Sequence, residues 1–296
     1  MGRTVGVGLV LGMVLQAAVA AAGSGDRLVS PVRLAVAGKG TLLVSDYRQK
    51  AVLVIDDRSL AVRRRLAVTG RPLAVGWAAG RLYVGNETTG LVEVYNEGGK
   101  LLTRFGETGA VPSDLAVDAG SGAVFVVDSA ARLVRVYDGA GNILRFIGGP
   151  AADNRLYRPT GIVLDEAGQQ VLVSDFGSPE AGIAPRVMVY DYAGAFRRLI
   201  PGTVNSGMLG SISLFSRPQG MALDGRGHLY LVDSLLGQVL VLDLQSGALV
   251  KTIGSFGTAP GELQLPLDVI IDGDGADLLV TNNRSGRIER FYGGAL

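Results

Sequence analysis

Cysteine is missing from the 296-residue sequence, and histidine occurs once, as His228. Without cysteine the chain has no disulfide, no lipid-modified cysteine and no zinc-binding thiolate. Because zinc sites are built mainly from cysteine and histidine, a single histidine argues against a histidine-rich metal centre. His228 follows a turn glycine, Gly227, so we expect a surface role for it rather than that of a catalytic base. A Ser-His-Asp triad is disfavoured for the same reason.

The sequence also has almost no excess of charge of one sign. The formal net charge is +1, and no long run of like charges occurs. The short run Arg63-Arg64-Arg65 is expected to lie on a solvated strand or turn. Nucleic-acid binding depends on concentrated positive charge, so we expect no nucleic-acid partner.

The apolar pattern of an amphipathic helix is absent as well. After the amino-terminal segment, no window of ten or more residues carries a convincing apolar stripe with a period of 3.6 residues. Glycine is abundant instead, with 44 residues dispersed along the chain, which is typical of many tight turns between short strands. A hydrophobic content of 48% supplies a large core. The sequence therefore predicts an all-β fold.

Residues 1–22 have the pattern of an export signal. Arg3 precedes an apolar stretch from about Val5 to Leu15, and small residues near Ala20 and Ala22 fit a signal-peptidase site. We therefore predict a signal peptide over 1–22, a single domain over 23–296, and an extracytoplasmic location, periplasmic or secreted. The alternative is an uncleaved anchor, because the apolar stretch nearly spans a bilayer. Membrane contact is expected only in that case.

The rest of the chain is a sixfold repeat. Each copy begins at a proline, and the six prolines are Pro31, Pro72, Pro112, Pro159, Pro218 and Pro266. Each copy also has an Asp or Asn at the end of its second apolar run, and these six residues are Asp46, Asn86, Asp128, Asp175, Asp233 and Asn282. The two sets of markers keep step along the sequence, which indicates duplication of one structural unit.

Each unit has three short apolar runs separated by turn residues, and a fourth run follows in most copies, as in 101–105, 143–147 and 249–253. Four antiparallel strands in 40 to 50 residues are typical of a propeller blade. We predict a six-bladed β-propeller of four-stranded antiparallel blades. The last copy ends before a fourth strand, so we expect residues 26–30 to pair with the last blade and close the ring.

The repeat resembles that of the NHL family of six-bladed propellers, which begins Pro-x-Gly-Ile-Ala-Val-Asp. The segments 159–165 (PTGIVLD) and 218–224 (PQGMALD) match this pattern closely, and the glycine-rich connector at 253–263 is also similar. The resemblance covers essentially the whole chain after the leader. It implies the fold but not one activity, because NHL repeats occur in scaffolds, receptors and a few enzymes.

The six Asp and Asn markers are expected to gather on one face of the disc, since all end the second strand. One interpretation is that each accepts hydrogen bonds from its own turn. The alternative is a divalent-metal-dependent hydrolase or lyase, in which Asp46, Asp128, Asp175 and Asp233 hold Ca²⁺ or Mg²⁺ in the central channel. We favour the first interpretation and expect no cofactor. The segment 272–277 (DGDGAD) lacks the spacing of an EF-hand loop.

Two insertions predict where a ligand binds. The loop 176–186 and the connector 201–217 are longer than their equivalents, and both should emerge on the face that carries the Asp and Asn markers. We therefore predict a noncatalytic binding module that recognises a protein, a peptide or another extracytoplasmic ligand through blades four and five. We expect a monomer. The predicted binding residues are Arg158, Asp175, Glu180, Arg186, Arg217 and Asp233.

Overall fold

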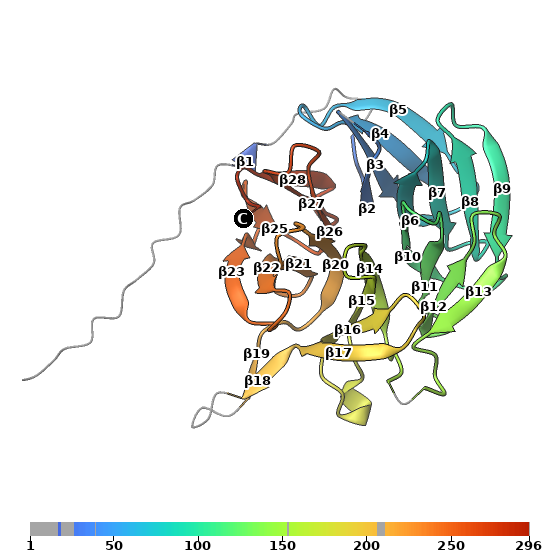
Figure 1. The fold of residues 1–296 in the computed structure, drawn as a ribbon. Helices are drawn as coiled ribbons and strands as arrows, with labels where there is room; N and C mark the ends of the chain where they lie inside the picture. The colour runs from blue at the N-terminus through green and yellow to red at the C-terminus, as the bar shows by residue number, and fades with distance from the viewer. Residues whose placement is uncertain (1–16, 19–26, 39, 153, 206–210, 296) are drawn as a thin grey trace, which may run out of the picture.

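The computed structural model describes residues 17–18, 27–38, 40–152, 154–205 and 211–295. These residues form six four-stranded antiparallel sheets arranged in a ring, as Figure 1 shows. Within this part of the chain the only helical segment is the single 3₁₀ turn η1 (Pro179–Ala181). No helix among the described residues has the length and hydropathy needed to cross a membrane. The predicted six-bladed propeller is confirmed.

The strands follow one another from the inside of each blade to its outside. Blade one has β2 (Pro31–Val36), β3 (Thr41–Asp46), β4 (Ala51–Asp56) and β5 (Val62–Ala67). Blade two has β6 (Pro72–Ala78), β7 (Arg81–Asn86), β8 (Leu91–Asn96) and β9 (Leu101–Gly106). Blade three has β10 (Pro112–Val117), β11 (Val124–Asp128), β12 (Leu133–Tyr137) and β13 (Ile143–Ile147).

The second half repeats this order. Blade four has β14 (Pro159–Asp165), β15 (Gln170–Asp175), β16 (Arg186–Asp191) and β17 (Phe196–Pro201). Blade five has β20 (Pro218–Leu223), β21 (His228–Asp233), β22 (Gln238–Asp243) and β23 (Leu249–Ile253). Blade six has β26 (Pro266–Ile271), β27 (Leu278–Asn282) and β28 (Arg287–Phe291), completed by β1 (Ala17–Ala18).

Two connectors carry additional short strands. The one between blades four and five contains the antiparallel pair β18 (Thr203–Asn205) and β19 (Ser211–Ser213). The one between blades five and six contains β24 (Ser255–Phe256) and β25 (Glu262–Leu263), which pair in parallel.

The ring is closed by an N-terminal strand, as expected, but the predicted position of that strand was wrong. Ala17 pairs with Phe291 and Ala18 with Arg290, whereas residues 27–30 form no strand. The amides of Val29 and Ser30 donate to the Asp46 carboxylate, which holds this stretch on blade one as its connector. Asp26 and, apart from β1, the predicted signal peptide at 1–22 lie outside the described residues. Removal of residues 1–22 would remove β1 and leave blade six with three strands.

The hydrophobic core lies between the blades. Six clusters of buried apolar side chains each span two neighbouring blades, from the first and second around to the sixth and first. The second and third strands are covered on both faces by adjacent blades, so their sequences are nearly continuous apolar runs rather than strict alternations. Val124–Asp128, for example, is buried throughout. The exposed Arg63-Arg64-Arg65 run lies on the outer strand β5, as the sequence indicated.

The innermost strands β2, β6, β10, β14, β20 and β26 contact one another in this cyclic order around the central axis. Small residues permit this close approach. A Cβ atom added at Gly220 would lie 1.9 Å from Asp268 Oδ1 and 2.8 Å from Asp268 Cα on the neighbouring innermost strand. The glycine of the repeat is therefore required by packing at the axis.

Gly220→Ala is expected to destabilise the fold by about 2 kcal/mol, because an overpacked site must displace a neighbouring backbone. Gly273→Ala is the matched control, since a Cβ atom there meets nothing within 4 Å. Urea unfolding of both variants measures the difference. Equal stabilities would show that the innermost strands are not closely packed at Gly220.

Candidate functional site

The six repeated Asp and Asn residues lie at the end of the second strand of each blade, on one face of the disc, here called the ring face. All six side chains are buried. The Asp233 carboxylate accepts hydrogen bonds from the amides of Ser216 and Arg217 in the preceding connector and from Leu235 and Leu236, at 2.9 Å each, in the following turn. Asp233 thus joins the start of its blade to the turn after its second strand, as Asp46, Asp128 and Asp175 do in their blades.

Asn86 makes the same connection with an amide, because its Nδ2 donates to the Thr69 carbonyl at 2.6 Å and its Oδ1 accepts from the Thr88 amide at 3.0 Å. Asn282 is bonded to the preceding connector alone among the described contacts. Asn282 Oδ1 accepts from the Gln264 amide at 2.9 Å, and its Nδ2 donates to the Glu262 carbonyl at 3.0 Å. Within the described ranges, no group of three or more His, Cys, Asp or Glu side chains is arranged to hold a metal ion. Asp46, Asp128, Asp175 and Asp233 are each bonded to the backbone of their own blade. These contacts agree with the interpretation that the repeated Asp residues accept hydrogen bonds from the backbone of their own blades.

The two insertions emerge over blades four and five on the ring face, as the sequence predicted. The loop after β15 contains η1 and is closed by a bridge between Ser178 and Ile183. The connector before β20 contains the β18–β19 pair, which extends from the disc at the end of β17 (Figure 1).

Phe176, the residue after the ring residue Asp175, organises the predicted site. The guanidinium carbon of Arg158 lies 5.6 Å from the centre of the Phe176 ring, and that of Arg217 lies 5.8 Å from it. Cations at such distances are attracted to the face of an aromatic ring. Arg158 and Arg217 are the residues before the first prolines of blades four and five, so Phe176 bridges the two blades.

The charges of the two arginines are balanced differently. Arg158 Nη2 lies 2.8 Å from Glu180 Oε1. Hydrogen bonds from its own backbone amide and from Ser178, together with Arg158, lower the pKa of Glu180 to about 2, so Glu180 is ionised at neutral pH. Arg217 is exposed, and among the described residues no carboxylate pairs with it. Arg217 therefore has an unneutralised positive charge.

A second aromatic ring extends this site. Arg155 and Arg186 lie 4.9 and 5.4 Å from the centre of the Tyr157 ring. Arg186 is mostly buried and pairs with Asp175 at 3.1 Å. Arg155 Nε donates to the Tyr157 hydroxyl at 2.9 Å. Arginine and aromatic side chains thus alternate across the ring face of blade four.

The same geometry occurs between blades one and two, with one difference. Arg71 lies 5.2 Å from the centre of the Tyr47 ring, and these residues occupy the positions of Arg217 and Phe176. Here Tyr47 donates to Glu87 at 2.7 Å, and Arg71 lies 3.7 Å from the same carboxylate. Blade five has Ser234 where blade two has Glu87. Arg217 therefore lacks the carboxylate that pairs with its counterpart Arg71, and the carboxylate of this site, Glu180, pairs with Arg158 instead.

The structure brings together five of the six predicted binding residues in two groups: Arg158, Glu180 and Arg217 around Phe176, and Asp175 with Arg186 beside Tyr157. Asp233 bonds only to backbone amides and is not part of the exposed site. Phe176, Tyr157 and Arg155 are not among the residues predicted from the sequence. The available signal was the aromatic residue directly after the ring residue, which recurs at Tyr47 and Phe176.

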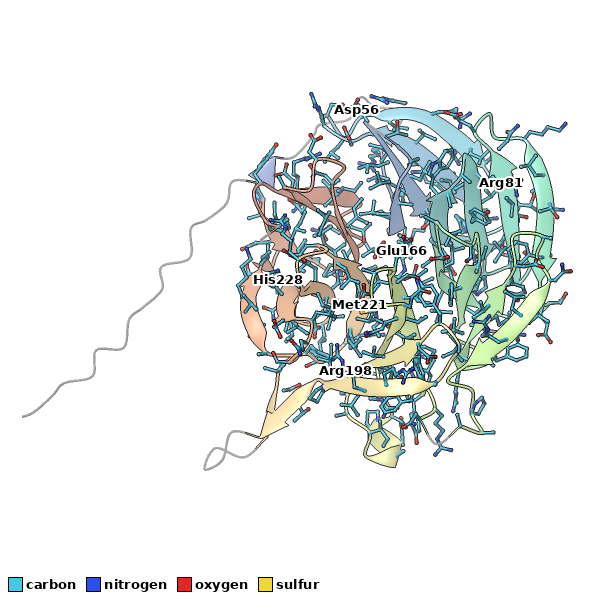
Figure 2. The ribbon with its side chains drawn as sticks, viewed as in Figure 1. Asp56, Arg81, Glu166, Arg198, Met221 and His228 are labelled. Atoms are coloured by element: carbon cyan, nitrogen blue, oxygen red, sulfur yellow. The ribbon has the colours of Figure 1, made fainter. Side chains whose placement is uncertain are left out.

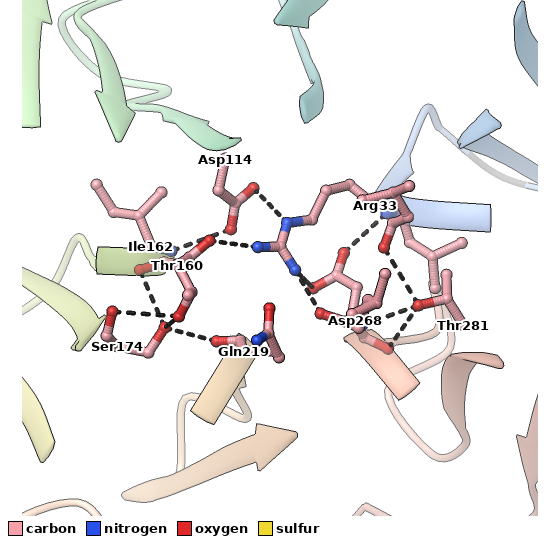
Figure 3. Close-up of polar contacts among 12 residues, drawn as sticks. Arg33, Asp114, Thr160, Ile162, Ser174, Gln219, Asp268 and Thr281 are labelled. Atoms are coloured by element: carbon pink, nitrogen blue, oxygen red, sulfur yellow. Dashed lines mark hydrogen bonds and ion pairs between the residues drawn. The ribbon is translucent and has the colours of Figure 1, made fainter. Parts of the chain in front are cut away.

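A buried ionic cluster lies among the innermost strands at the central axis (Figure 3). Arg33 on β2 is 3% exposed, and its Nε lies 3.3 Å from Asp114 Oδ1 while Nη1 lies 3.9 Å from Asp268 Oδ1. The guanidinium also donates to the carbonyls of Leu267 and Thr160. Burial raises the pKa of both carboxyls, that of Asp268 to about 7, although Arg33 opposes the shift. Four blades are thereby joined at the axis.

His228 lies on the face opposite the ring residues, at the start of β21 (Figure 2). Its Nδ1 is 2.6 Å from the Oδ2 of Asp224, the first residue of the turn that joins β20 to β21. Its side chain is only partly exposed. The contact ties the two ends of this turn together, which agrees with the expected surface-turn role.

The fold and the site define a six-bladed β-propeller with an arginine-rich and aromatic ring face. A structure of hydrazine synthase from Kuenenia stuttgartiensis is similar to the chain with a TM-score of 0.66 and 17% identity, over 98% of this chain and 100% of that one. A protein of unknown function from Bacteroides thetaiotaomicron gives a TM-score of 0.72 and 18% identity, over 94% of this chain and 76% of that one. At these identities the similarity concerns the fold alone. No family model and no curated protein sequence matches the chain.

Proposed function

We propose that this chain is an exported, noncatalytic propeller of the NHL type that binds an acidic segment of a protein or peptide partner. The binding surface is the ring face of blades four and five. The observation that carries the proposal is the position of Arg217, which contacts Phe176 but pairs with no carboxylate in the described part of the chain. At the equivalent place in blades one and two, Glu87 neutralises Arg71. A partner carboxylate would take the place of Glu87.

The distribution of charge supports an acidic partner. In the described turns and connectors of the ring face, basic residues outnumber acidic ones: Arg27, Arg48, Lys50, Arg71, Arg132, Arg155, Arg158, Arg217 and Arg284 against Glu87, Glu107, Glu180 and Glu262. Among the described residues, the turns of the opposite face are mainly acidic, with Asp57, Glu97, Asp118, Asp138, Glu166, Asp224, Asp272, Asp274 and Asp277 against Arg58, Lys100 and Arg226. The small net charge conceals this separation. A basic face attracts and orients an acidic partner.

Selection of a displayed peptide library against the full chain is expected to enrich acidic peptides. Arg217→Met should weaken the binding of a selected peptide about tenfold, because a charge-assisted hydrogen bond and a cation–π contact are lost. Arg158→Met should weaken it less, since Glu180 already pairs with Arg158. Glu180→Gln should strengthen binding by releasing Arg158. Fluorescence anisotropy at two salt concentrations measures these changes.

Arg81→Met is the matched control, because Arg81 is an exposed arginine at the start of β7 on the opposite face (Figure 2). It is expected to bind the peptide as the wild type does. Selected peptides without acidic residues, or equal losses in Arg81→Met and Arg217→Met, would refute the proposed surface.

A further inference from the structure

A cavity lies on the ring face, at the place where the first and last blades meet. Its volume is about 440 Å³, and it is lined by Val29, Ser30, Arg48, Leu265, Asn283 and Arg284. Blade one contributes Val29, Ser30 and Arg48, and blade six contributes the other three. None of these residues belongs to the site over blades four and five. The volume is in the range of small-molecule sites.

The two arginines of this cavity occupy equivalent positions in adjacent blades. Arg48 and Arg284 each lie two residues after the ring residue of their blade, Asp46 and Asn282. The other four blades have Thr88, Ala130, Gly177 and Leu235 at this position. Both arginines are exposed, and neither guanidinium has a hydrogen bond or an ion pair within the described part of the chain. Two unneutralised guanidinium groups therefore border one cavity.

The remaining lining is partly fixed and partly apolar. Asn283 Nδ2 donates to Ser30 Oγ at 3.0 Å and to the Pro31 carbonyl at 2.9 Å, which fastens the two blades together beside the cavity. Val29 and Leu265 are 39% and 36% exposed. Among the described residues no carboxylate lines the cavity, and the nearby Asp46 is buried and bonded to the amides of Val29 and Ser30.

Leu265 adopts a left-handed backbone conformation, with φ of 54°. This conformation is uncommon and strained for a bulky residue. Its carbonyl accepts a hydrogen bond from the Asn283 amide, which holds the residue in place. The strain thus occurs at the residue that supplies the apolar wall of the cavity.

We propose that this cavity binds a small organic dianion with a short apolar body, either a dicarboxylate or a phosphomonoester. The planar guanidinium group donates two parallel hydrogen bonds to carboxylate or phosphate oxygens, and two such groups match a charge of −2. Val29 and Leu265 provide the surface against which an apolar body packs. The site is independent of the peptide surface proposed above.

Isothermal titration calorimetry of the full chain with glutarate and with phenyl phosphate tests this proposal. At least one of the two dianions should bind, and the stronger one identifies the class. Butyrate and inorganic phosphate, which lack one charge or the apolar body, should bind more weakly by about tenfold. Arg48→Met and Arg284→Met should each weaken the binding of the dianion about tenfold, and the double variant should abolish it.

Arg81→Met and Arg217→Met serve as controls and should leave the affinity for the dianion unchanged. Both cavity arginines are exposed and make no side-chain hydrogen bond, so their variants should keep the thermal midpoint of the wild type. Absence of binding by both dianions would overturn the proposal. So would equal affinity for inorganic phosphate, or unchanged binding in the double variant.

Discussion

Replacing Arg33 with methionine is expected to destabilise the folded chain by about 3 to 5 kcal/mol at pH 8, the usual result of leaving a buried charge without its partner. Arg33 is the only cation near Asp114 and Asp268 among the contacts that the structure describes at the axis. Its loss also frees the carbonyls of Thr160 and Leu267. Urea unfolding, with the midpoint and slope fitted separately, measures the change in the free energy of unfolding.

The effect should depend on pH in a defined direction. Because burial raises the pKa of Asp268 from 3.8 to about 7, the folded chain holds a proton that the unfolded chain releases between these values. Stability contributed by this group is present below pH 4 and is lost as the pH rises through about 7. Removing Arg33 takes away the group that opposes this rise. The Arg33→Met deficit should therefore be smaller at pH 5 than at pH 8.

A triple variant tests whether the buried charges cause this loss of stability. Adding Asp114→Asn and Asp268→Asn to Arg33→Met removes the three charges of the axial cluster, while the asparagine oxygens can still accept from the amides of Ile162 and Leu34. This triple variant should recover much of the lost stability and show little dependence on pH between 5 and 8. A triple variant no more stable than Arg33→Met would show that the charges are not the cause.

Asp233→Ala is expected to cost about 3 kcal/mol or more. The substitution leaves the amides of Ser216, Arg217, Leu235 and Leu236 without their acceptor in a buried place. Each buried donor left unsatisfied costs roughly 1 to 3 kcal/mol, reduced where water enters. The same urea titration measures this loss.

Asp233→Asn is the informative partner of this variant. Blades two and six have asparagine at the equivalent position, where one oxygen accepts from an amide and the nitrogen donates to a carbonyl. Asp233→Asn should therefore retain more stability than Asp233→Ala. Equal loss in both variants, or full stability of Asp233→Ala, would contradict a structural role for the ring residues.

The repeat pattern was sufficient to predict the number of blades, their strands and the ring face, because the markers Pro31 to Pro266 and Asp46 to Asn282 each occupy one fixed place in a blade. Each marker pairs with its partner across the first two strands, as Pro218 does with Asp233. The repeated turn residues of the six blades were therefore sufficient to predict the architecture. The insertions after Asp175 and Pro201 likewise indicated the face on which they emerge.

Contacts between residues of different blades were not predictable in this way. Arg33, Asp114 and Asp268 occupy the position two residues after the proline, where blades four and five have Gly161 and Gly220. Their charge was a signal, but only the closed ring shows that residues 33 and 268 meet across the first and last blades. The same is true of Phe176 and Arg217, which lie on neighbouring blades and are joined by no local pattern.

The closing strand illustrates the same limit. Residues 27–30 precede Pro31 as other connectors precede their prolines, and the Asp46 carboxylate binds Val29 and Ser30 in the manner of the other ring residues. The repeat itself therefore assigns this stretch to blade one. Pairing of β1 with β28 depends on a free strand edge, which any nearby extended segment can satisfy.

The most direct test of the binding surface is photo-crosslinking in intact cells that produce the protein, with benzoylphenylalanine replacing either Phe176 or the exposed Gln245 on the opposite face. We expect an adduct with an acidic partner from position 176, and this adduct should be lost when Arg217→Met is added. No equivalent adduct should form from position 245. Adducts from position 245 alone, or an adduct from position 176 that persists without Arg217, would contradict the proposed surface.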